Sequence, residues 1–75
     1  MIIFSTHSLV KSEQRNIRKE LVVKAVNKPD YEFKGRGDRR IVYKKFSRIY
    51  LKVIFRKESK NIIIITQHWD KTFKP

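Results

Sequence analysis

The chain has 75 residues, of which 40% are apolar, so it can form one small domain over residues 1–75 and has no room for a second. It has no cysteine, which excludes disulfide bonds and thiolate metal sites. Two histidines alone do not make a structural zinc site, so we expect no metal and no other cofactor. The 19 Lys and Arg residues outnumber the 7 Asp and Glu residues, and the net charge of +12 favours a polyanionic partner such as nucleic acid, an acidic membrane face or an acidic protein.

The chain begins with a predicted strand and a short helix. The apolar residues 2–4 predict the strand, and Ser5 or Thr6 then supplies a side-chain oxygen that can cap a helix. This helix is expected over residues 6–15, with Asn16 as its C-cap. Its main apolar contacts are expected to come from Leu9 and Val10.

A second helix is predicted over residues 17–27. Its apolar side chains recur at helical spacing and form one stripe, which consists of Ile17, Leu21, Val22, Ala25 and Val26. Pro29 ends the helix, because proline disfavours the helical conformation at Lys28.

The rest of the chain predicts strands. We expect them at residues 31–33, 40–46, 49–56 and 61–66, with loops at 35–38, 47–48 and 57–60 and an irregular segment from residue 67 onward. Residues 49–56 alternate, so one sheet face receives Ile49, Leu51, Val53 and Phe55 and the other receives Tyr50, Lys52, Ile54 and Arg56. The strand at 61–66 is the most apolar, which predicts a central position covered on both faces. The expected fold is α+β, with two N-terminal helices packed on one face of a small, mainly antiparallel sheet.

The positive charge is concentrated in the middle of the chain. Residues 34–57 contain ten basic side chains and one acidic side chain, Asp38, and aromatic residues lie among them. Cations bind phosphates and aromatic rings stack on unpaired bases, so this stretch predicts a nucleic-acid interface. The expected RNA-binding residues are Arg39, Arg40, Tyr43, Lys44, Lys45 and Arg48. A solvated sheet edge in which lysines prevent aggregation is the alternative interpretation.

Four short motifs resemble those of a family of small bacterial proteins related to the BrnT and RelE/ParE toxins. They are Phe4-Ser5-Thr6-His7, Arg15-Asn16-Ile17, Asn27-Lys28-Pro29 and Ile65-Thr66. The resemblance covers residues 3–66 and depends on the order and spacing of the motifs. One position departs from it, because Arg18 stands where the family usually has a Ser or Thr helix cap.

This resemblance implies a RelE/BrnT-like fold and, as in many relatives, a ribonuclease toxin of a toxin–antitoxin module. It also implies RNA as the substrate and an acidic antitoxin protein as the partner. No apolar run approaches the roughly 20 residues of a membrane span, and the first residues do not have the pattern of a signal peptide. With the lack of cysteine, this favours a cytoplasmic location.

Cleavage of RNA by its own 2′-hydroxyl needs a proton acceptor, groups that stabilise the phosphate charge and a proton donor for the leaving oxygen. Toxins related to this family often use Arg, Lys, Tyr and His for these roles. The expected catalytic residues are Tyr50, Lys52, Arg56, His68 and His7. His7 matches a histidine that recurs in the family, but it could instead be a structural histidine bonded to a sheet carbonyl. His68 could reach the open sheet face, or Trp69 beside it could simply cover the edge of the core.

Two functions follow from these observations. The first is a metal-independent endoribonuclease toxin. The second is a basic protein without catalysis that binds nucleic acid or an acidic protein through the same surface. An enzyme needs a proton carrier on that surface, whereas a binding protein needs only charge and stacking groups.

Overall fold

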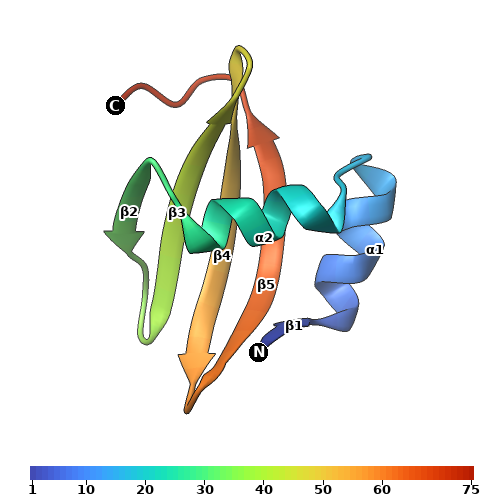
Figure 1. Cartoon of the computed structure of the whole chain (residues 1–75), viewed down its shortest axis with the longest axis vertical. Helices are drawn as coiled ribbons and strands as arrows, with labels where there is room; N and C mark the ends of the chain where they lie inside the picture. Colours follow the sequence, from blue (N-terminus) through green and yellow to red (C-terminus); the bar gives the residue numbers. More distant parts are fainter.

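A computed structural model describes residues 1–75 and shows two helices on one face of a five-stranded sheet (Figure 1). The elements in chain order are β1 (Ile2–Phe4), α1 (Thr6–Gln14), α2 (Lys19–Asn27), β2 (Tyr31–Lys34), β3 (Arg39–Phe46), β4 (Ile49–Glu58) and β5 (Asn61–Asp70). The predicted α+β fold with two N-terminal helices is therefore confirmed. Neither helix combines the length and the apolar content that crossing a bilayer requires.

The sheet has the strand order β1-β5-β4-β3-β2. The short strand β1 runs parallel to β5, and all other neighbours are antiparallel. The strand that begins near residue 61 was predicted to be central, and β5 is an interior strand, since β1 and β4 flank it, although β4 occupies the middle of the sheet. The long antiparallel neighbours β3, β4 and β5 follow one another in the chain, so short turns suffice to connect them.

The core lies between α2 and the sheet, which α2 crosses obliquely (Figure 1). The predicted apolar stripe of the second helix is confirmed, since Val22 and Ala25 are fully buried. On the sheet side, Leu51 and Val53 are also fully buried, whereas Lys52 between them points to the opposite face and is partly exposed. The period-2 alternation of β4 thus divides the apolar side chains of the core from the polar side chains of the other face.

Several boundaries differ from the prediction. Helix α2 begins at Lys19, so Ile17 of the predicted stripe is buried but precedes the helix. The ends of the last two strands differ most. Strand β4 continues to Glu58, and only Ser59 and Lys60 form the turn to β5, with Ser59 at a positive φ of 59°. Strand β5 continues to Asp70, although residues 67–75 were expected to be irregular. The reason is that β4 extends over ten residues, and its first half needs a hydrogen-bonded neighbour.

Helix α1 packs through polar side chains, contrary to the prediction. Leu9 and Val10 were expected to make its apolar contacts, yet they are 40% and 47% exposed. The buried side of α1 consists of Ser8 and Ser12, which lie against Gln67 of β5.

The amide of Gln67 is completely buried and joins α1 to the sheet. Its Nε2 donates to the carbonyl oxygen of Ser8 at 2.8 Å and to the hydroxyl of Ser12, while the Ser8 hydroxyl donates to Gln67 Oε1 at 2.6 Å. Ser5 caps the helix and also donates to the Ile65 carbonyl at 3.3 Å. No buried side-chain nitrogen or oxygen in the chain lacks a partner, so this polar contact is fully satisfied.

Replacing Gln67 by leucine should destabilise the fold although it adds apolar volume to a buried position. The Ser8 and Ser12 side chains would lose their partners inside the protein, and the expected cost is about 1–3 kcal/mol of unfolding free energy. Urea unfolding followed by circular dichroism measures it. Gln14→Leu, at an exposed position of α1, is the matched control and should change stability little. A stability of Gln67→Leu equal to that of the wild type would contradict the structural role of this amide.

Candidate nucleic-acid interface

The face of the sheet opposite the helices, here called the open face, collects most of the predicted functional side chains. Cross-strand register places them side by side, because residues directly opposite each other project to the same face. The polar and charged members of β3, β4 and β5 on this face are Arg39, Tyr43, Lys45, Tyr50, Lys52, Arg56, Glu58, Asn61, Thr66, His68 and Asp70.

Lys52 lies at the centre of the open face. It stands opposite Tyr43 on one side and opposite His68 on the other. Its ammonium lies 5.8 Å from the centroid of the Tyr43 ring, a distance typical of a cation–π contact. The sequence left the register open, so it predicted these residues individually but did not predict that Lys52 separates the other two.

This environment favours the neutral form of His68. Partial burial lowers its pKa below the ordinary value, and the positive charges of Lys52 and Arg15 lower it further, while Asp70 opposes the shift. A neutral imidazole has a free nitrogen lone pair, so His68 can accept a proton from a bound ligand. Trp69 points to the other face and packs against the core, whereas His68 lies on the open face, where its role as an acid or base stays a prediction.

Arg15 is a member of the site that the sequence analysis missed. It follows α1, and its guanidinium donates to the Gln67 carbonyl at 2.8 Å and to the Thr66 hydroxyl at 3.5 Å. This brings a cation from the helix to the edge of the open face. In the sequence, only the position of Arg15 directly after the helix could have indicated this contact. Many basic residues at such a position make no contact with a sheet.

Arg56 and Arg39 extend the positive surface toward the end of the sheet where the turn between β4 and β5 lies. They are directly opposite each other on β4 and β3, and Arg56 forms an ion pair of 2.8 Å with Glu58. Like charges at opposed positions repel, so an anion placed between the two guanidinium groups would stabilise this pair.

An aromatic cluster covers the opposite end of the open face, toward the turn between β3 and β4. Phe73, from the segment after β5, stacks on Tyr43 with a centroid distance of 3.7 Å and an interplanar angle of 11°. Its ring also meets Tyr50 edge-on at 5.0 Å and Tyr31 at 5.6 Å. Tyr43 is consequently buried, with 9% of its surface exposed. The sequence analysis did not predict a role for Phe73, because nothing in residues 71–75 indicates that they fold back over the sheet.

Several predicted residues lie elsewhere. Arg40 and Lys44 alternate with the open-face residues of β3 and point to the helix-bearing face, while Arg48 lies in the turn between β3 and β4. His7 is exposed in the first turn of α1 and makes no side-chain hydrogen bond.

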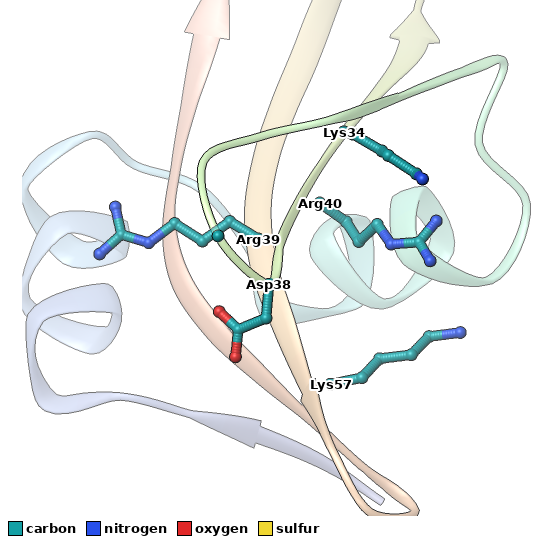
Figure 2. A pocket seen from close by; sticks show the side chains of 6 residues that line it. Lys34, Asp38, Arg39, Arg40 and Lys57 are labelled. Atoms are coloured by element: carbon teal, nitrogen blue, oxygen red, sulfur yellow. The ribbon is translucent and has the colours of Figure 1, made fainter.

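Two basic hollows lie outside the group around Lys52. One, of about 290 Å³, is lined by Lys24, Asn27, Lys28 and Lys44 beside the end of α2. The other, of about 330 Å³, lies where β2, β3 and β4 meet, and Figure 2 shows Lys34, Arg40 and Lys57 extending to its same side while Arg39 points away from them. Neither hollow is lined by Tyr43, Lys52 or His68.

Comparison with protein-family models, with curated proteins and with solved structures produced no match. No group of three or more His, Asp or Glu side chains gathers where it could hold a metal ion. The functional interpretation consequently depends on the geometry and chemistry of the side chains.

The effect of Lys52 on His68 can be measured directly. Replacing Lys52 by glutamine removes a positive charge, so the pKa of His68 should rise toward its ordinary value of about 6.5. An NMR titration of the imidazole measures the change. Lys57→Gln is the matched control. Lys57 is on the same strand, but it lies two residues beyond Phe55 and projects to the helix-bearing face, away from His68.

The same titration has a consequence for stability. Because the pKa of His68 is lower in the folded protein, the unfolded chain binds more protons in the window just below the ordinary value. Folding stability should therefore decrease as the pH falls through that window, and the decrease should be smaller in Lys52→Gln. An unchanged His68 pKa in Lys52→Gln would contradict the proposed electrostatic coupling.

Proposed function

We propose that the protein binds RNA on the open face of its sheet and cleaves it without a metal ion, as a cytoplasmic toxin of a toxin–antitoxin module. The observation that supports this most directly is the arrangement of Tyr43, Lys52 and His68 across three neighbouring strands. It combines a stacking group, a cation and a neutral proton acceptor on one surface.

The cleavage step uses these side chains in distinct roles. His68 accepts the proton of the ribose 2′-hydroxyl, and the resulting oxygen attacks the adjacent phosphorus. Lys52 and Arg56 stabilise the added negative charge on the phosphate oxygens. The bond between phosphorus and the 5′-oxygen breaks, Tyr50 supplies the proton to the leaving oxygen, and a 2′,3′-cyclic phosphate results.

The charge of the open face also supports the proposed antitoxin partner. Lys45 and Lys52 form no ion pair within the chain, and the two ion pairs that exist involve Arg40 and Arg56. An acidic protein segment laid over the open face would neutralise these cations and exclude RNA from the same surface.

A second candidate function is binding without catalysis. It is favoured by the position of the two hollows, neither of which is lined by His68 or Lys52. Catalysis requires that reacting groups be positioned closely around the phosphate, whereas binding along a basic surface does not.

RNA binding is tested by its dependence on salt. Each phosphate contact that is lost should reduce the slope of log affinity against log salt by about 0.7 for a single strand. The variant Lys45→Gln/Lys52→Gln should therefore bind a labelled oligouridylate more weakly and with a shallower slope. The control Lys24→Gln/Lys28→Gln removes the same charge from the helix side and should retain a slope closer to that of the wild type. Equal slopes in the wild type and the open-face variant would remove this surface from the proposal.

Cleavage is tested in the presence of excess EDTA. Wild-type protein should cleave RNA and leave cyclic phosphate ends, and His68→Gln should slow cleavage by about a hundredfold or more, because it removes the proton acceptor. Arg56→Ala should have an effect of similar size by removing a charge-stabilising donor. Binding without any cleavage would favour the second candidate function, and a loss in His7→Gln but not in His68→Gln would transfer the role of proton acceptor to α1.

A further inference from the structure

The segment that follows β5 crosses the sheet toward β2 (Figure 1). Asp70 directs this segment, because its Oδ1 accepts hydrogen bonds from the Thr72 amide at 2.9 Å, from the Thr72 hydroxyl at 2.9 Å and from the Phe73 amide at 3.0 Å. These bonds form a tight turn and lower the pKa of Asp70. The turn places the ring of Phe73 over the open face.

The position of Phe73 matches that of a stacked base. Its ring lies parallel to Tyr43 at 3.7 Å, and Tyr50 and Tyr31 contact it at an angle. Unpaired nucleobases bind protein aromatic side chains in this parallel arrangement. Lys52 lies beside the same tyrosine, at 5.8 Å from its centroid, where a cation can meet the phosphate of a bound nucleotide.

Little besides the ring holds this segment in place. Residues 71–75 make no ion pair, and their hydrogen bonds go only to Asp70. Phe73 does not belong to the hydrophobic core between α2 and the sheet. It can therefore leave the open face without disturbing that core.

We propose that Tyr31, Tyr43 and Tyr50 form a stacking site for an unpaired nucleobase, and that Phe73 occupies this site in the free protein as a tethered competitor. This inference depends on the proposed RNA binding and specifies its substrate as single-stranded. A base of the bound strand displaces Phe73, stacks on Tyr43 and leaves its phosphate next to Lys52. Duplex RNA cannot do so, because its bases are already stacked in the helix.

The test compares variants of the full chain by fluorescence anisotropy with a labelled oligouridylate. Phe73→Ala removes the competitor without changing the charge, so it should bind about tenfold more tightly, which is within the usual range for stacking of one base. The salt dependence should be the same as in the wild type. Phe73→Trp supplies a larger competing ring and should bind more weakly. Lys74→Ala, which alters the same segment but keeps the ring, should give no gain.

Three further measurements make the result specific to the stacking site. The tighter binding of Phe73→Ala should disappear when Tyr43→Ala is added, and it should be absent for duplex RNA. In the wild type, NMR cross-peaks between the rings of Phe73 and Tyr43 should disappear when the oligouridylate saturates the protein. Circular dichroism of each variant establishes that the fold is retained.

The outcomes separate this inference from the proposed function. If the wild type binds RNA with a salt dependence but Phe73→Ala binds no more tightly, the stacking site is wrong and RNA binding stands. The same holds if the ring cross-peaks persist in the complex, or if duplex RNA shows an equal gain. If neither the wild type nor Phe73→Ala binds RNA, both proposals are wrong.

Discussion

The pleat of β4 is the constraint on which both faces of the protein depend. This strand pairs with β3 through residues 49–56 and with β5 through residues 50–58, so its register determines where the neighbouring side chains project. Leu51 and Val53 enter the core while Lys52 points to the open face between Tyr43 and His68. A shift of one residue would bury the lysine and expose the apolar side chains, so the stability of the core selects the register that assembles the candidate site.

The sequence predicted this division because alternation in an antiparallel strand is a local property. It did not predict the attachment of α1, because Ser8 and Ser12 have value as buried residues only when Gln67 is opposite, and that partner is more than fifty residues away in the chain. The sequence instead indicates Leu9 and Val10 as the contacts of α1 with the sheet, because helices usually pack through apolar side chains. The candidate residues on β4 were similarly accessible from the pattern, whereas Arg15 and Phe73 act through contacts with distant strands that no local pattern encodes.

The net charge of +12 destabilises the folded state by repulsion, and ion pairs within the chain offset little of it. Only Arg40 and Arg56 form ion pairs, both with exposed partners, and such pairs contribute little to stability. The other cations repel one another on both sides of the sheet, at Lys24, Lys28 and Lys44 as well as around Lys52. Because a bound polyanion would relieve this repulsion, binding should stabilise the folded state in addition to filling the site.

The relation between Phe73 and His68 joins the two proposals. In the free protein, Phe73 shields Tyr43, and burial together with the charges of Lys52 and Arg15 keeps the pKa of His68 low. Under the two proposals, a nucleotide that displaced the ring would bring a phosphate next to Lys52, and its negative charge would oppose the field of that lysine. The pKa of His68 would then rise toward neutrality, where proton transfer in both directions is most efficient. A substrate would thus adjust the proton acceptor by the same contact through which it binds, and an anionic antitoxin segment that leaves Phe73 in place would neutralise Lys52 without presenting a hydroxyl to His68.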